Sequence, residues 1–202
     1  LAIAGEARIP VTAAAGGSGV CGSSVPLYGG IVLGLGDLKG IRDVDDTSLT
    51  ADVLAGTFGD QFEHELRTSH GLTCGHWPQS VELSTVGGWV ATRAAGQFST
   101  AYGSIEDLVL ALEVVLPDGR VLRTRETPRA AAGPDLRQIF MGSEGTLGVV
   151  TEVTFSVRPQ PESRRLAAYH FESLESGLEA IRRFMRGGWR PPVVRLYDER
   201  ES

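Results

Sequence analysis

A glycine-rich loop near the start of the chain most constrains what the chain can fold into. Residues 13–26 read AAAGGSGVCGSSVP, and such small side chains leave the backbone N–H groups open to an anion. Gly17, Gly19 and Gly22 have the G-x-G-x-x-G spacing of a dinucleotide-binding loop, which requires a strand before the loop and a helix directly after it. A strand is expected at residues 9–12, but the proline that ends the loop argues against the helix. The loop is therefore predicted to bind a phosphate and to lead into a strand, the alternative being a tight turn of small residues.

Composition and charge narrow the class of protein. With 202 residues and 42% hydrophobic content, the chain has enough apolar side chains for one core and the beginning of a second. It begins with Leu1 rather than methionine, so we expect it to be part of a longer protein. The absence of a membrane-length apolar run, the net charge of −6 and the two cysteines predict a cytoplasmic protein without a transmembrane segment or a nucleic-acid partner. The four histidines are scattered, so no metal site is predicted.

The periodicity of apolar residues predicts an α+β fold in two parts. A buried strand is expected at residues 31–35, and further strands at 49–54, 108–116, 120–124 and 147–158. Helices are expected at residues 57–71 and 84–95, the first capped by Thr57 and the second by Ser84. Beyond the Pro-Gln-Pro sequence at 159–161, a strand at 165–171, a helix capped by Ser173 and a strand at 193–197 resemble the start of a second unit. We therefore place a domain boundary between residues 1–160 and residues 161–202.

A second glycine-rich element, STVGGW, occupies residues 84–89. Gly87 and Gly88 would let a ligand approach the first turn of the expected helix, whose N–H groups attract a pyrophosphate or a flavin carbonyl. The alternative is close packing of the helix against a sheet.

A third element and two single residues complete the candidate site. Residues 142–149, GSEGTLGV, place three glycines at the mouth of a strand, where close approach by a ligand is expected. Met141 stands where a hydrolase elbow needs glycine, so a hydrolase is rejected. His76 lies in a Gly/Pro-rich loop and is either structural or catalytic. Arg195 alternates with apolar neighbours, which by itself favours the solvent face over a polar pocket.

Taken together, these elements resemble the FAD-binding domain of the vanillyl-alcohol oxidase superfamily, also called the PCMH-type flavin fold. Within that superfamily they are most similar to the alkyldihydroxyacetonephosphate synthases. The likeness is carried by the two loops and by residues 75–76, 84–89, 92–94, 102–109, 133–135 and 195–196.

The resemblance implies an FAD cofactor and a set of residues that bind it. The FAD-binding residues so implied are Ala13, Ala14, Ala15, Gly16, Gly17, Ser18, Gly19, Gln79, Ser80, Val81, Glu82, Leu83, Ser84, Thr85, Gly87, Gly88, Thr92, Arg93, Ala94, Ala95, Glu144, Gly145, Thr146, Leu147, Gly148, Val149 and Val150. Arg195 matches an arginine that the family needs near the flavin, so the resemblance overrides the solvent-face interpretation. Arg195 and His76 are thus the candidate catalytic residues.

Three positions depart from the family pattern. Ala15 replaces a glycine of the first loop, and Gln79 stands where the family usually has aspartate. Residue 18 is serine rather than the histidine that tethers FAD in some relatives, so we expect the cofactor to be bound non-covalently.

The resemblance also implies a reaction. In the synthases, the acyl group of acyl-dihydroxyacetone phosphate is exchanged for a fatty alcohol through a flavin N5 adduct, and further catalytic residues would lie beyond Ser202. The fragment alone is then expected to be inactive, with a small-molecule or lipid-phosphate substrate and a possible homodimer for the whole protein. One alternative is an FAD-linked oxidoreductase acting on a 2-hydroxy acid such as D-lactate or glycolate. Another is a flavin-binding module without catalytic activity.

Overall fold

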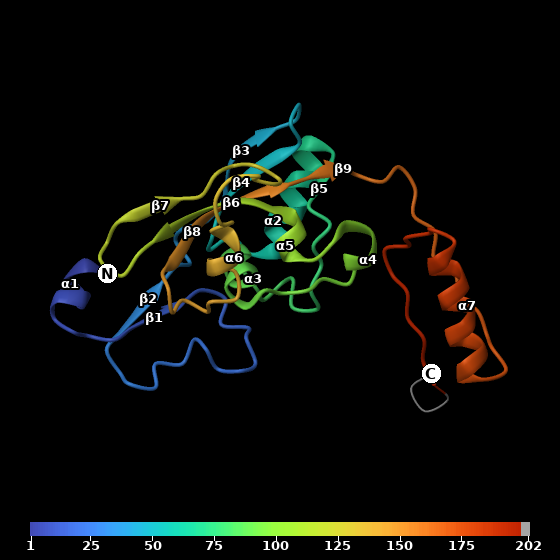
Figure 1. Ribbon diagram of the computed structural model, residues 1–202, viewed down its shortest axis with the longest axis horizontal. Coiled ribbons are helices and arrows are strands. Elements are labelled where there is room, and N and C mark those ends of the chain that lie inside the picture. Colours follow the sequence, from blue (N-terminus) through green and yellow to red (C-terminus); the bar gives the residue numbers. More distant parts are fainter. Residues whose placement is uncertain (199–202) are drawn as a thin grey trace.

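A five-stranded antiparallel sheet forms the centre of the computed structural model, which describes residues 1–198 (Figure 1). Its order is β3-β4-β8-β6-β7, and its strands are β3 (Ile41–Asp45), β4 (Thr50–Leu54), β6 (Val109–Val115), β7 (Val121–Arg123) and β8 (Val149–Ser156). The central strand β8 is buried on both faces at residues 153–155, since Val153 and Phe155 are fully buried and the intervening Thr154 is only 8% exposed. Strands β6 and β7 pair as an antiparallel hairpin, with Val115 opposite Val121, and confirm the strands predicted at residues 108–116 and 120–124. The mixture of this sheet with helices confirms an α+β fold.

A small parallel sheet carries the glycine-rich loop. Strands β1 (Val11–Ala14) and β2 (Ile31–Gly34) pair in parallel, with Val11 opposite Ile31. Parallel neighbours need a crossover connection, and here the loop itself makes it without a helix. The prediction that the loop leads into a strand is confirmed. The expectation that this strand is buried is wrong, because Ile31 and Val32 are exposed.

Two helices pack on the central sheet through aromatic side chains. Helix α2 (Gly59–Glu65) continues as the π-helical turn η1 (Leu66–His70) and ends at Gly71, whose φ of 65° is the left-handed cap conformation that glycine adopts without strain. Helix α3 (Val86–Thr92) brings Trp89 to the sheet. The ring centroids of Phe62 and Phe155 are 5.4 Å apart, and those of Trp89 and Phe155 are 6.5 Å apart. Both helices thus share Phe155 of β8 as a packing partner.

The N-cap of each helix lies one residue after the predicted one. Phe58, not Thr57, is the N-cap of α2, and the Thr57 hydroxyl donates to the Leu54 carbonyl instead (2.6 Å). Thr85 caps α3 by accepting a hydrogen bond from the Gly88 amide (3.3 Å). The predicted cap, Ser84, is used for a contact with Trp89, because its hydroxyl accepts the indole N–H at 2.7 Å.

The remaining short elements connect these layers. They are α1 (Ala2–Glu6), α4 (Ser99–Tyr102), α5 (Ile105–Leu108), α6 (Arg137–Phe140) and the antiparallel pair β5 (Leu72–Thr73) and β9 (Arg158–Pro159). The long strand expected at residues 147–158 is therefore divided into β8 and β9. β9 pairs with β5 rather than with the central sheet.

Helix α7 (Leu174–Arg186) follows the proline-rich segment and stands apart from the sheets in Figure 1. Ser173 caps it as predicted, accepting from the Ser176 amide at 3.2 Å. The strands expected at residues 165–171 and 193–197 are wrong: neither segment pairs with another part of the described chain. The domain boundary at residue 160 stays a prediction. Within residues 1–198, no helix is both long and apolar enough to cross a membrane.

Candidate functional site

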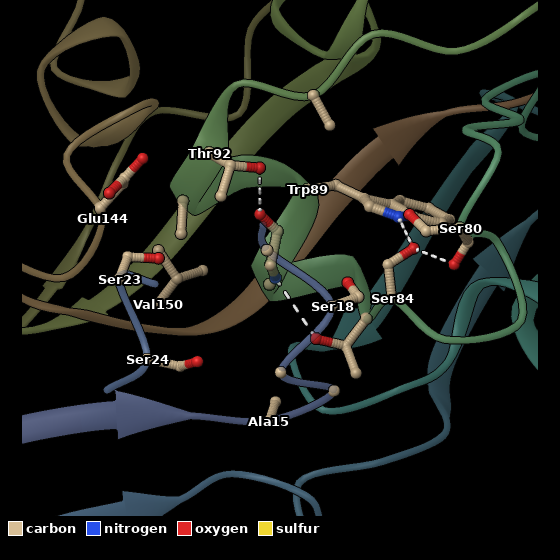
Figure 2. A pocket seen from close by; sticks show the side chains of 18 of the residues that line it. Ala15, Ser18, Ser23, Ser24, Ser80, Ser84, Trp89, Thr92, Glu144 and Val150 are labelled. Carbon is tan, nitrogen blue, oxygen red and sulfur yellow. Dashed lines mark hydrogen bonds between the residues drawn. The ribbon is translucent and has the colours of Figure 1, made fainter. Parts of the chain in front are cut away.

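The three glycine-rich elements meet around one cavity of about 740 Å³ (Figure 2). Most of the residues implied for FAD binding line it, namely Ala13, Ala14, Ala15, Gly16, Gly17, Ser18, Gly19, Gln79, Ser80, Ser84, Thr85, Gly87, Gly88, Thr92, Ala94, Ala95, Glu144, Gly145, Gly148, Val149 and Val150. Arg195 lines it as well. Segments far apart in the sequence thus surround one cavity.

The first loop has free backbone donors at this cavity. None of the amides of residues 16–24 donates a hydrogen bond to another residue of the described chain. Gly17 has a φ of 64° and Gly22 a φ of 79°, which side chains rarely tolerate. At Gly16 a Cβ would lie 2.3 Å from the Leu83 carbonyl oxygen, so only glycine lets the loop approach the segment before α3. The loop therefore brings a run of unpaired N–H groups to the cavity, and backbone N–H groups of this kind bind oxyanions.

The first turn of α3 does not supply the free donors that the sequence suggested. The Val86 amide donates to the Thr57 carbonyl (2.9 Å) and the Gly87 amide to the Ala55 carbonyl (2.8 Å). A Cβ on Gly87 would lie 2.6 Å from the Ala55 Cβ. The glycines here permit close packing of α3 on the sheet, which is the alternative that the sequence left open. They still contribute a flat wall to the cavity.

The third element is held against the end of α3. The Gly142 amide donates to the Val90 carbonyl and the Glu144 amide to the Ala91 carbonyl, both at 2.9 Å. Arg93 ends α3 with a φ of 51°, and its guanidinium donates to the carbonyls of Gln138 and Met141, both at 3.3 Å. Arg93 is outside the cavity lining and fixes the loop that carries Glu144.

Five other implied residues also lie outside the lining. Val81 belongs to the hydrophobic core, whereas Glu82 and Leu83 are exposed beside the cavity. Thr146 and Leu147 are exposed in the turn before β8, where the Thr146 hydroxyl donates to the Ser143 carbonyl (2.6 Å). A role for these five in binding stays a prediction.

Several lining residues were not in the predicted set. They are Val20, Cys21, Ser23, Ser24, Leu35, Ala55, Trp89, Ala91, Gly96, Gln97 and Ser143. Five of them directly adjoin predicted residues, and Cys21, Ser23, Ser24 and Gln97 lie a few positions further along the same motifs. Leu35 and Ala55 belong to none of the motifs. Figure 2 shows Ser84 between Trp89 and Ser80, with its hydroxyl donating to the Ser80 carbonyl at 2.7 Å. This chain of hydrogen bonds fixes the indole at the cavity wall.

His76 lies behind the wall rather than on it. Its ring contacts the edge of Trp89, with centroids 4.6 Å apart, and only 1% of the residue is exposed. Neither ring nitrogen has a hydrogen-bond partner among the described residues. Burial lowers the pKa of His76 to about 4, so the imidazole is neutral at physiological pH. A catalytic role for His76 stays a prediction.

Arg195 lines the cavity and is also exposed to solvent, so both interpretations of its pattern fit the structure and its place near the flavin stays a prediction. Its Nη1 donates to the Tyr197 hydroxyl at 3.3 Å. Among the described lining residues, Arg195 and Glu144 are the two charged side chains. The other lining residues are uncharged, and most of them are small.

The cavity fits a large, flat, anionic cofactor. Free amides at one side suit a pyrophosphate, and the glycine and alanine wall along α3 suits an aromatic ring system. A metal centre has no comparable support, since residues 1–198 contain no group of three or more His, Cys, Asp or Glu placed to hold an ion.

Comparison with known proteins agrees with this geometry. A family model described as FAD binding domain matches residues 1–125. An alkyldihydroxyacetonephosphate synthase of Caenorhabditis elegans is 44% identical over 77% of the chain, and the FAD-linked oxidoreductase YgcU of Escherichia coli, itself uncharacterised, is 40% identical over 96%. The glycolate oxidase subunit GlcD of Bacillus subtilis is 32% identical over 98%.

A solved structure gives the same result. An alkyldihydroxyacetonephosphate synthase superposes on 80% of the chain with a TM-score of 0.74 and 32% identity. The chain spans 26% to 42% of the length of the three relatives above and 29% of that solved chain. The matched family model covers more than half of the chain and agrees with the glycine-lined cavity. The chain therefore belongs to the FAD binding domain family, and its cofactor is FAD.

Proposed function

We propose that the chain binds FAD non-covalently in the large cavity and presents it to an anionic small-molecule substrate beside Arg195. The observation that carries this proposal is the run of free amides at residues 16–24, which faces the glycine and alanine wall of α3 across one cavity. In this assignment, the loop of residues 13–19 holds the pyrophosphate, and the residues after Glu144 contact the remainder of the cofactor. Ser18 offers no ring nitrogen for a covalent tether.

The protein's part in the chemistry is binding and positioning. Bound FAD supplies an isoalloxazine ring that exchanges electrons with a substrate or bonds to it. The small-residue wall excludes water from that ring, and the Trp89–Ser84 hydrogen bond keeps the wall rigid. Arg195 offers a planar guanidinium that holds a phosphate or carboxylate with two parallel hydrogen bonds and stabilises developing negative charge.

The reaction that we propose is of the alkyldihydroxyacetonephosphate synthase type, in which the acyl group of acyl-dihydroxyacetone phosphate is exchanged for a fatty alcohol. The identity of 44% to the worm enzyme and the superposition on a solved synthase support it. A second candidate is oxidation of a 2-hydroxy acid. It is supported by relatives named glycolate oxidase subunit and D-lactate dehydrogenase, which match 98% and 90% of the chain.

An anaerobic titration of the FAD-loaded, full-length protein separates the two candidates. D-lactate, glycolate and an acyl-dihydroxyacetone phosphate are added separately while visible flavin absorption and released fatty acid are recorded. Release of fatty acid with incorporation of a fatty alcohol is expected for the exchange reaction. Full bleaching of the flavin absorption by a hydroxy acid, without fatty-acid release, would contradict it and establish the oxidoreductase.

With either substrate, Arg195→Ala is expected to retain FAD and lose turnover. Arg190→Ala changes an exposed arginine outside the lining, so this control variant should be active.

A further inference from the structure

A second cavity of about 330 Å³ adjoins the first. Gln97 and Arg195 line both cavities, so a molecule in the second one reaches the wall where the cofactor lies. Its volume is in the range of small-ligand sites. The proposed function uses only the first cavity and leaves this one unexplained.

The second cavity is built from two aromatic rings between two arginines. The Trp77 and Phe98 ring centroids are 6.1 Å apart, and the Gln97 amide donates to the Trp77 carbonyl at 2.8 Å, which holds their two segments together. The Arg67 guanidinium lies over Trp77 at 5.4 Å, and the Arg164 guanidinium lies over Phe98 at 5.2 Å. Such stacking orients a guanidinium plane and leaves its edge N–H groups for a ligand.

The charge of the lining is positive. Arg67, Arg164 and Arg195 line the cavity, and none of the described lining residues is acidic. Arg67 is neutralised from behind by buried Glu63, whose carboxylate lies 2.7 Å from its Nη2. No acidic residue of the described lining balances the positive charges of Arg164 and Arg195, which lie beside the apolar surface of the Trp77 and Phe98 rings.

We infer that the second cavity is the substrate's anion subsite, taking a phosphate or carboxylate joined to an apolar group, with Arg164 and Phe98 as specificity-determining residues. The oxyanion is bound between Arg164 and Arg195, and the apolar part lies on the Trp77 and Phe98 rings. This inference rests on the proposed function, because Arg195 is what joins the subsite to the cofactor cavity.

The competing explanation is that the stack is purely structural. Arg164 follows the proline-rich segment, and its contact with Phe98 joins the chain after β9 to the loop before α4. On that explanation, replacing Arg164 changes stability and leaves anion affinity unchanged. The neighbouring Arg165 is exposed and outside the lining, so it provides a control with the same change in net charge.

The test is calorimetric titration of the FAD-loaded, full-length protein with phenyl phosphate, phenylacetate and neutral benzyl alcohol. We expect the anions to bind more tightly than the alcohol. Arg164→Gln should weaken binding of the tighter anion by about tenfold, since a hydrogen bond to a charged group contributes roughly 1.5 kcal/mol. Arg165→Gln should leave that affinity unchanged.

Tighter binding of phenyl phosphate indicates a phosphate substrate, and tighter binding of phenylacetate indicates a carboxylate substrate. Phe98→Ala should weaken phenyl phosphate and leave inorganic phosphate unchanged.

The outcomes separate this inference from the proposed function. If FAD is retained and the two arginine variants bind the anions equally, or if benzyl alcohol binds as tightly as the anions, the anion subsite is overturned and the proposed function is untouched. If the protein does not retain FAD at all, the proposed function fails, and the subsite that depends on it fails with it.

Discussion

At the scale of single residues, His76 shows how a polar side chain is kept in an apolar setting. Its ring is buried against Trp89, and a Cβ on Gly96 would lie 3.2 Å from its Nδ1. Water is excluded on these sides, so protonation is unfavourable inside the protein and favourable in the unfolded chain. His76 therefore stabilises the fold only while it is neutral.

This arrangement makes stability depend on pH. The pKa of His76 is about 4 in the folded protein and ordinarily 6.5, so the unfolded chain binds the proton first as the pH falls. We expect the free energy of unfolding to decrease by about 2 kcal/mol from roughly pH 7 to pH 5 through this residue alone, and to stop decreasing below about pH 4. Urea unfolding of the wild type and of His76→Leu, which lacks this proton, measures the difference. His170→Gln, at an exposed histidine, is the control and should retain the full decrease.

The prediction is contradicted if the free energy of unfolding of the wild type changes with pH no more than that of His76→Leu. That result would show that His76 is accessible to water or paired. The sequence did not reveal the burial of His76. A histidine in a loop of glycine and proline is compatible with a site wall or with a core, and only the position of Trp89 decides between them.

At the scale of elements, α3 depends on its contact with β4 more than on its own sequence. The helix spans only seven residues and contains two glycines, which disfavour helix by about 1 kcal/mol each. Its Gly87 amide bonds to the Ala55 carbonyl directly after β4, and no larger side chain fits between them. The sequence predicted a helix over residues 84–95, which is longer than α3, and placed its N-cap at Ser84 instead of Thr85. The pattern of residue types could not show that the Ser84 hydroxyl bonds to Trp89.

We expect Gly87→Ala to destabilise the protein by about 1–3 kcal/mol, because its methyl group would lie 2.6 Å from the Ala55 Cβ and push α3 off the sheet. The matched control is Gly34→Ala in β2, where a Cβ meets no atom within 4 Å. Thermal or urea unfolding of both variants gives the comparison. Equal stability of the two would mean that α3 does not pack on β4 as closely as described.

The two strands predicted in the last part of the chain show where periodicity misleads. Residues 165–171 and 193–197 have the apolar content of strands, yet Leu166, Tyr169 and Tyr197 are exposed. A strand is stable only where a neighbour takes its backbone hydrogen bonds, and neither segment has such a neighbour among residues 1–198. Helix α7, whose hydrogen bonds are internal, forms as predicted.

At the scale of the whole molecule, the site could be predicted because each motif is local. Loops of glycine and small residues have few uses, so residues 13–19 and 142–149 pointed to a ligand before any packing was known. The sequence could not predict that the two loops meet beside α3. Their positions depend on the tertiary structure, because the loop of residues 142–149 leads into β8 and the loop of residues 13–19 follows β1 of the β1–β2 pair. Leu35 and Ala55, which line the cavity but belong to none of the motifs, were missed for this reason.

The measurement that tests the central claim most directly is the FAD content of Gly17→Val beside Gly29→Val. Both glycines lie between β1 and β2 with φ near 65° and no atom within 4 Å of a built Cβ, so the backbone strain is alike. Only Gly17 lines the large cavity. We predict that Gly29→Val purifies with FAD as the wild type does, whereas Gly17→Val folds but retains little or none by visible absorption. Full FAD occupancy in Gly17→Val would contradict the assignment of this loop to the cofactor.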